Sequence, residues 1–399
     1  MSFVSLGSIL ASLESGARPP GGVSADSGEI PSLGGEHLTE DGGFDFTSIK
    51  RIPRAFFETM KGGRIAARDI LVVKDGATTG KTSFVGGDFP FPEAAINEHV
   101  FCLRVDQSKA SPEYVFHFLR SPIGQRAIAL DFRGATVGGI SRGFAKKVRL
   151  PLPSLPEQRR IAGILDKADA LRAKRRAALA QLDILIQSIF LDMFGDPATN
   201  PKGWPNTELK DCIERIQIGP FGSLLHREDY ITGGVPLVNP KHIQSGAIVV
   251  GDGESITTQK YTQLNAYHLR AGDVVMGRRG EMGRCAIVDA ASCPLLCGTG
   301  SLFIRPDNIR TSSLFLWATL SSASIKSKLE RLSLGQTLPN LNTQIVEHLQ
   351  VPLAPIELQR DFVRRVAAVN LLRTKQQTSC RQLQYLFTSL QYRAFQGEL

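Results

Sequence analysis

The sequence predicts an α+β protein: two α/β units in tandem duplication, joined by two long helices that form an antiparallel coiled coil with pseudo-two-fold symmetry. Two observations predict this fold. Blocks of sequence recur in the same order at an offset of about 200 residues, and each half of the chain ends in a long heptad pattern. The 399 residues also suffice for two or three domains.

The repeat is visible in three pairs of blocks. They are IPSLGGEHL with VPLVNPKHI, DILVVKDGATTGKTSFV with DVVMGRRGEMGRCAIV, and LPLPSLPEQRRIAGILDKADALRAK with VPLAPIELQRDFVRRVAAVNLLRTK. The last pair, 150–174 and 351–375, aligns without a gap. Tandem duplication explains this agreement far better than chance. It divides the chain into an α/β unit (1–152), a long helix (153–195), a linker (196–203), a second α/β unit (204–353) and a second long helix (354–399).

Both long helices carry an apolar seam. In the first, the a positions are Ile161, Ala168, Leu182 and Ile189, the d positions are Ile164, Leu171, Ala178 and Leu185, and Arg175 is the polar exception. In the second, the a positions include Phe362, Val369, Leu383 and Leu390, and the d positions include Leu372 and Leu386. A helix of about 38 residues is about 57 Å long. Such a seam needs a partner helix, and the duplicate is the obvious one.

The stretch ILVVKDGATTGKTS (70–83) resembles a phosphate-binding loop, which leaves an NTP-binding enzyme as the alternative function. The spacing is one residue short of a P-loop, and the second copy has Cys285 where the first has Thr82. Both copies keep a cation at the start of a Gly turn and another after its last Gly. These cations are Lys74 and Lys81 in the first copy, and Arg278, Arg279 and Arg284 in the second. This recurrence favours contact with nucleic acid over a solvated hairpin.

Composition supports an anionic partner. The net charge is +9, from 47 Lys and Arg against 38 Asp and Glu. A purely structural scaffold without DNA fits these basic turns less well. The six cysteines form no C-x-x-C pair, so we expect buried thiols and no metal site. We also expect no signal peptide, no membrane span and a cytoplasmic location.

No complete catalytic motif is found. NPKH (239–242) lacks the second Pro and the aromatic residue of an adenine-methyltransferase loop, and ELK (208–210) is an isolated match to a nuclease motif. His37 and His242 recur in both copies without a shared nucleophile, so we expect them to stabilise turns or contact DNA. The chain is therefore expected to be non-catalytic.

Four segments together resemble a known family. They are the LPLPSLPEQRR entry to the first helix, GWPNTELKDCIERIQIGPFG at the start of the second half, the paired Gly turns, and the terminal LFTSLQYRAFQGEL. The chain resembles the specificity subunit of type I restriction–modification systems over nearly its whole length. The second helix entry, PIELQR, departs from the regular Pro-x-Glu-Gln order.

The resemblance implies two target recognition domains, each reading one half of a split double-stranded DNA sequence. The helices would set the spacing and dock two methyltransferase subunits, and restriction subunits would join the full complex. S-adenosylmethionine, ATP and Mg are then expected on partner subunits, with no cofactor in this chain. The Gly-Thr segments GATVGGIS (134–141) and GQTLPNLN (335–342) also occupy matching positions.

Two sets of residues carry these expectations. The expected DNA-binding residues are His37, Lys74, Lys81, Thr136, Arg142, Lys241, His242, Arg278, Arg279, Arg284 and Gln336. The expected coiled-coil and partner-docking residues are Ile161, Leu171, Leu182, Leu185, Phe362, Leu372, Leu383 and Leu386.

Overall fold

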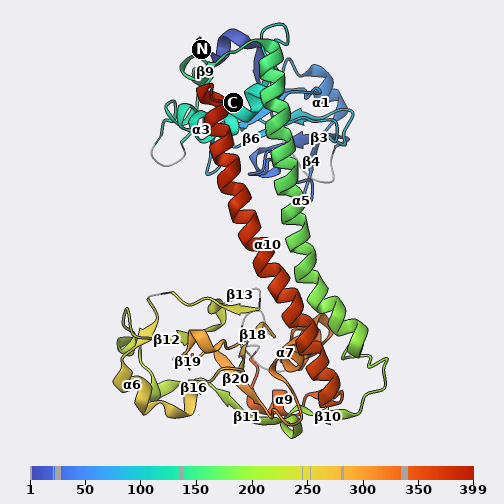
Figure 1. Ribbon diagram of the computed structural model, residues 1–399, viewed down its shortest axis with the longest axis vertical. Helices are drawn as coiled ribbons and strands as arrows, with labels where there is room; N and C mark the ends of the chain where they lie inside the picture. The colour runs from blue at the N-terminus through green and yellow to red at the C-terminus, as the bar shows by residue number, and fades with distance from the viewer. Residues whose placement is uncertain are drawn as a thin grey trace. The chain divides into compact units, whose positions relative to one another are not determined.

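The structure is a computed structural model that describes residues 2–20, 22, 28–134, 138–244, 246–251, 253–279, 283–333 and 340–399 (Figure 1). The chain forms two compact units. Unit 1 comprises Met1–Ala177 and Gln377–Leu399, and unit 2 comprises Ala178–Gln376. Each unit therefore contains one globular part, part of the first long helix and part of the second.

In its described residues, the globular part of unit 1 contains short strands and four α-helices. The strands are β1 (Phe3–Ser5), β2 (Leu10–Ser15), β3 (Ile30–Leu33), β4 (Lys50–Ile52), β5 (Ile70–Val73), β6 (Thr82–Phe84), β7 (Ala95–Ile96), β8 (Val100–Val105) and β9 (Arg149–Pro151). The helices are α1 (Arg54–Thr59), α2 (Pro112–Arg120), α3 (Pro122–Ala129) and α4 (Phe144–Lys147). The main sheet has the order β2-β8-β5-β6, a second sheet has the order β4-β3-β7, and β1 pairs with β9.

The globular part of unit 2 repeats this arrangement. Its strands are β10 (Asn206–Glu208), β11 (Ile213–Ile218), β12 (Val235–Val238), β13 (Ile243–Gln244), β14 (Ala247–Ile248), β15 (Ser255–Ile256), β16 (His268–Leu269), β17 (Val274–Gly277), β18 (Cys285–Ile287), β19 (Leu295–Cys297), β20 (Ser301–Pro306) and β21 (Gln350–Pro352). Its helices are α6 (Thr258–Gln263), α7 (Ser313–Ser321), α8 (Ala323–Ser333) and α9 (Thr343–Glu347). The main sheet β11-β20-β17-β18 has the strand order of its counterpart in unit 1.

The central strand of each main sheet is apolar on both faces because both faces are covered. In β5, Ile70 and Val72 pack in the core beneath α2. The alternating residues Leu71 and Val73 pack on the other side with the second sheet. Strand β17 repeats this division between two cores. An uninterrupted apolar run therefore marks a doubly covered strand in both units.

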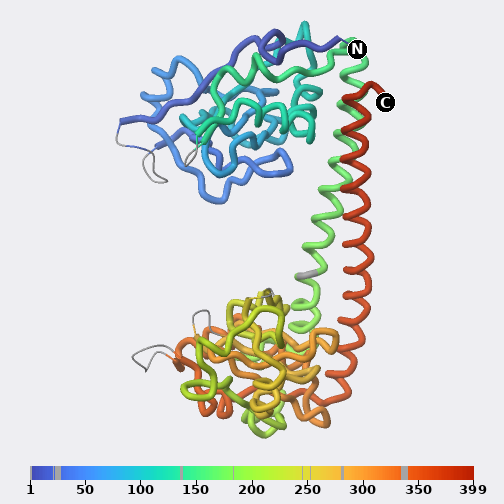
Figure 2. Tube along the Cα trace, turned by 90° about the vertical axis from the view of Figure 1, so that its left-hand side faces the viewer, coloured from blue at the N-terminus to red at the C-terminus, as the bar shows by residue number. Residues whose placement is uncertain are grey.

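The long helices are α5 (Leu155–Phe194) and α10 (Ile356–Gln396). Within each unit the start of one helix packs antiparallel against the end of the other (Figure 2). In unit 1, Leu165 of α5 shares a core with Ala394 and Phe395 of α10. In unit 2, the ring of Phe190 on α5 lies 5.7 Å from that of Phe362 on α10. The antiparallel pairing expected from the sequence is thus present in both units.

A fully buried glutamine at the start of each long helix joins the helix to its globular part. Gln158 Oε1 accepts a hydrogen bond from Ser111 N at 2.9 Å, and its Nε2 donates to Pro153 O at 2.8 Å. Gln359 Oε1 accepts from Ser312 N at 2.8 Å, and its Nε2 donates to Ala354 O at 2.8 Å. Ser111 and Ser312 are the N-caps of α2 and α7. The segment PIELQR therefore keeps the glutamine that makes this contact, Gln359, although its Pro and Glu are shifted relative to the first copy.

The seam of the long helices differs from the expected one by one residue at four of the d positions. Ile161, Phe362, Leu182 and Leu383 are buried or partly buried as expected of a positions. The expected d residues Leu171, Leu185, Leu372 and Leu386 are exposed, and the next residue of each heptad faces the partner helix instead. In unit 1 that residue is Arg172, whose guanidinium lies 4.2 Å from the centre of the Phe387 ring.

One helix also departs from the expectation that no segment could span a membrane. An 18-residue window of α5 has a mean hydropathy of 1.5. By length and composition only, α5 could therefore cross a membrane. In unit 2, however, Phe190 and Phe194 of this helix pack in a core with Phe315 and Phe362. Length and composition alone do not distinguish a bilayer span from a helix that packs on protein.

The glutamine contact predicts a loss of stability that can be followed in unit 2 alone, because both tryptophans, Trp204 and Trp317, belong to it. Gln359→Ala leaves buried backbone groups without a partner and should lower the free energy of unfolding by about 1–3 kcal/mol. Urea unfolding followed by tryptophan fluorescence measures this. Gln181→Ala, at an exposed position of α5, is the control and should change little.

The corrected seam predicts which leucines of α5 stabilise the protein. Leu165→Ala removes a fully buried side chain and should cost about 2–5 kcal/mol. Leu171→Ala removes a side chain that is 46% exposed and should change the free energy by no more than about 0.5 kcal/mol. Urea unfolding followed by circular dichroism compares the two variants. Equal costs would restore the original d register.

Candidate nucleic-acid interface

The Gly turn of unit 1 is the tip of a β-hairpin. Strands β5 and β6 are antiparallel, with Ile70 opposite Phe84. The turn is closed by Gly80 N, which donates to Val73 O at 2.8 Å. Gly76 and Gly80 have φ angles of 91° and 88°, in the left-handed region that favours glycine. A P-loop leads from a strand into a helix, whereas this turn leads into a second strand.

The side chain at the position that binds magnesium in a P-loop makes a hydrogen bond within the turn instead. Thr82 is buried, and its hydroxyl donates to Gly80 O at 2.9 Å. In the second copy, Cys285 is also buried, and its thiol donates to Gly283 O at 3.2 Å. Both side chains therefore hold the turn closed, and the NTP-binding interpretation has no support.

The hairpin tip of unit 1 lies against the segment that follows the Gly-Thr motif. Lys74 N donates to His99 O at 2.8 Å, and Ile140 N donates to Lys74 O at 2.7 Å. A Cβ atom on Gly139 would lie 2.7 Å from Lys74 O, so only glycine permits this approach. Two segments selected from the sequence are thus brought together, although they are about 60 residues apart.

Unit 2 uses the same backbone frame. Arg278 N donates to Gly300 O at 3.0 Å, and Leu341 N donates to Arg278 O at 3.1 Å. These three residues align with Lys74, His99 and Ile140 of unit 1. The frame that presents the Gly turn therefore occurs once in each unit.

The exposed polar groups of the frame in unit 1 come from three segments. Lys74 is partly exposed, and its ammonium lies 3.7 Å from the Asp75 carboxylate. His99 also pairs with Asp75, at 2.5 Å between Nδ1 and Oδ1. Arg142, which follows Ile140 by two residues in the chain, is also exposed. His99 is not among the residues expected from the sequence to bind DNA. Those residues were indicated by their recurrence in both copies, whereas the counterpart of His99 is Gly300.

Arg278 does not fit its expected role as a DNA-binding residue. It is buried, and its Nε donates to Leu341 O at 2.7 Å. Burial, with repulsion from Arg279, lowers the pKa of its guanidinium. Arg278 therefore holds the frame together, and Arg279, which is exposed, is the cation available at this tip. Lys241 is exposed as well and forms an ion pair with Glu254.

The two repeated histidines stabilise turns. The expectation that His37 contacts DNA is therefore wrong, because its side chain is buried. His37 is 1% exposed; its Nδ1 accepts from Gly34 N at 2.9 Å, and its Nε2 lies 3.1 Å from Ser48 O. His242 is also buried, and its Nδ1 accepts from Asn239 N at 3.1 Å. Of the two roles expected for the pair, stabilising a short helical turn is the one that their contacts support.

The second cation of each turn lines a cavity, and in unit 1 this cavity is bordered by the long helices. Lys81 lines a polar cavity of about 230 Å³ together with Arg120, Arg172 and Gln125. Its ammonium lies 3.7 Å from the Glu40 carboxylate. In unit 2, Arg284 lines a cavity of about 480 Å³ that also contains Lys326. The paired cations of each copy thus face different surroundings.

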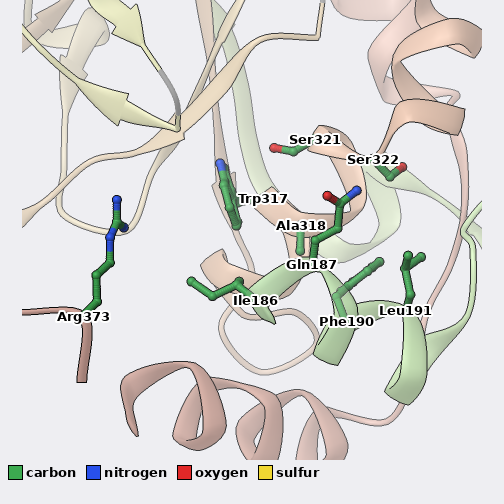
Figure 3. Close-up of a pocket in the computed structure, with 9 residues that line it drawn as sticks. All are labelled: Ile186, Gln187, Phe190, Leu191, Trp317, Ala318, Ser321, Ser322 and Arg373. Atoms are coloured by element: carbon green, nitrogen blue, oxygen red, sulfur yellow. The ribbon is translucent and has the colours of Figure 1, made fainter. Parts of the chain in front are cut away.

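Beside the Arg284 cavity, unit 2 has a more apolar cavity of about 430 Å³ between α5, α7 and α10. Ile186, Phe190 and Leu191 project into it from α5, and Trp317 and Ser321 from the α7 side (Figure 3). In unit 1 the residue aligned with Ser321 is Arg120. The unit 2 cavity is thus lined by one arginine, Arg373, where unit 1 has both Arg172 and Arg120 at the aligned positions.

Some expectations lie outside these observations. Thr136 and Gln336 are not among the residues that the structure describes. Within the described ranges, no group of three or more His, Cys, Asp or Glu side chains could hold a metal ion. Cys102, Cys212, Cys285 and Cys297 are buried, while Cys293 is exposed and Cys380 partly exposed.

The chain is similar in sequence to several known proteins. The chain is 24% identical to the EcoBI specificity subunit of a type I restriction enzyme from Escherichia coli, over 77% of this chain and 69% of that protein. It is 21% identical to the MjaVIII specificity subunit from Methanocaldococcus jannaschii, over 87% and 81% of the two chains. The StySPI specificity subunit from Salmonella potsdam is 23% identical, over 90% and 80%.

Two solved structures have the same fold. A chain from a study of complex assembly and conformational transition of the type I R-M system matches with a TM-score of 0.62 at 18% identity, over 100% of this chain and 98% of that one. The type I S subunit from M. genitalium matches with a TM-score of 0.55 at 14% identity, over 99% and 96%. The type I restriction modification DNA specificity domain matches residues 1–181 and 201–378. The chain therefore belongs to the family of type I restriction–modification specificity subunits.

Proposed function

We propose that this chain is the DNA-reading subunit of its complex and that each unit reads one half of a bipartite target. The frame around the Gly turn, present once in each unit, is the observation that carries the proposal. Each tip presents an exposed or partly exposed cation, Lys74 in unit 1 and Arg279 in unit 2. An arginine or lysine of this kind can donate to guanine in the major groove or to a phosphate.

The long helices support a second role, docking of two methyltransferase subunits. Both carry large apolar side chains that face away from the helix seam. The most exposed are Leu171, Ile184, Leu371, Leu372, Tyr385, Leu386 and Tyr392. An apolar surface of this kind marks a site of protein association. The leucines that were expected in the seam but are exposed thus stay candidates for partner docking.

Chemistry then belongs to the partners. We propose that this chain is non-catalytic, and that S-adenosylmethionine, ATP and Mg bind to the methyltransferase and restriction subunits that join it. The buried hydrogen bonds of Thr82 and Cys285 support this division, because they leave the Gly turns closed. The family membership supports a place in such a complex.

Sequencing of methylated bases in the host genome, with and without this gene, tests the proposal. Loss of a methylated motif made of two half-sites separated by unspecified bases is the expected result. The half-site centres should lie about one DNA turn, about 34 Å, apart. A lost motif that is short and continuous would contradict two readers.

The two tips should act on different half-sites. Arg279→Gln should cost about 1–3 kcal/mol and relax one position in the half-site read by unit 2, if its guanidinium contacts a base. Lys74→Gln should affect the other half-site only. The same methylation profile measures both variants, with Arg364→Gln on α10 as a control of equal charge change. Simultaneous relaxation of both half-sites by one substitution would be evidence against one reader in each unit.

A further inference from the structure

The long-helix part of unit 1 contains an arginine cluster to which neither half-site reading nor methyltransferase docking, as proposed above, assigns a role. Arg172, Arg175 and Arg176 of α5 and Arg381 of α10 line a cavity of about 220 Å³. Cys380, Leu383 and Gln384 complete its wall. Residues 171–177 read LRAKRRA, which places four basic residues and no acidic one in two turns of helix.

The acidic groups that pair with this cluster are shared. Asp169 pairs with Arg172 at 2.5 Å and with Arg120 at 2.7 Å. Asp41 pairs with Arg176 at 2.8 Å. Burial lowers the pKa of Arg172, Asp169 opposes this shift, and repulsion from Arg176 and Arg120 adds to it. Two carboxylates thus pair with three guanidinium groups, those of Arg120, Arg172 and Arg176.

The cluster continues into the basic cavity beside the Gly turn. Arg172 and Gln384 line both the arginine cavity and the cavity that contains Lys81 and Arg120. A series of basic side chains therefore leads from the hairpin of unit 1 onto its long helices. Arg176 also reaches the globular part directly through its ion pair with Asp41.

The duplication supplies an internal comparison. When the ungapped alignment of the helices is continued, Arg172 aligns with Arg373, whereas Arg175 and Arg176 align with Gln376 and Gln377. Arg381 aligns with Ala180. The helix pair of unit 2 thus forms with one of the four arginines. Folding of the seam therefore does not require the other three.

We propose that the arginine cluster binds phosphates of the spacer DNA next to the half-site read by unit 1. This inference rests on the proposed function, because it assumes that unit 1 reads one half-site. Guanidinium groups suit phosphate oxygens, and backbone contacts position a protein on DNA without reading sequence. Continuity with the Lys81 cavity favours DNA over an acidic protein partner.

The test uses the complex assembled with its methyltransferase subunits and a duplex that carries the target found by methylation sequencing. Affinity is measured over a range of salt concentrations. Arg175→Gln with Arg381→Gln should reduce the slope of log affinity against log salt by about 1.8, about 0.9 for each lost phosphate contact. The bases recognised should not change. The control, Arg364→Gln with Arg365→Gln, removes the same charge from α10 in unit 2 and should leave the slope unchanged.

A second measurement does not depend on the variant folding. Neutral methylphosphonates in the spacer beside the unit 1 half-site should lower the slope of the wild-type complex, and those beside the unit 2 half-site should lower it less. An unchanged slope in a complex that still binds its target would overturn the inference and leave the proposed function intact. Loss of methyltransferase docking with an unchanged slope would assign the cluster to protein binding and overturn it too. Failure of the wild-type complex to bind any bipartite duplex would instead refute the proposed function.

Discussion

The hydrogen-bonded glutamine at the start of each long helix is the contact on which the arrangement of each unit depends. A helix of about 40 residues can contribute to DNA reading only if the reading domain is held to it in one orientation. Gln158 and Gln359 do this with both ends of the amide, which join the helix start to the N-cap of the helix that covers the main sheet. Because the amides are fully buried, either bond is costly to break.

Much of the fold could be predicted from the sequence. The repeat, the long helices and the doubly covered strands all leave patterns in residue type, which one sequence can show. The register of the seam, in contrast, is not determined by such a pattern. Ile164 and Leu165 are both apolar, and Arg172 competes with Leu171 for the same face. The structure places Arg172 against Phe387 because an aromatic ring accepts a cation there, and residue counting does not detect that pairing.

The candidate interface was predictable in its location and less so in its individual residues. The Gly turns and the segments that meet them were found by repetition. Arg278 and His37 were assigned to DNA because charge and recurrence look alike for binding and for structure, while burial separates the two. Repetition also fails where the copies have diverged. His99 and Arg120, whose counterparts are Gly300 and Ser321, are such places. Divergence is what two readers of different half-sites require.

The claim that the helices, fixed to each reading domain, set the distance between half-sites is open to one direct measurement. Removing one heptad from each helix, residues 177–183 and 373–379, preserves the seven-residue phase of the seam and leaves the four arginines in place. It shortens each helix by about 10 Å, at 1.5 Å per residue. Methylation sequencing in a host that carries this variant should show the same half-sites with a spacer about three base pairs shorter, at 3.4 Å per base pair. An active complex with an unchanged spacer would contradict the account.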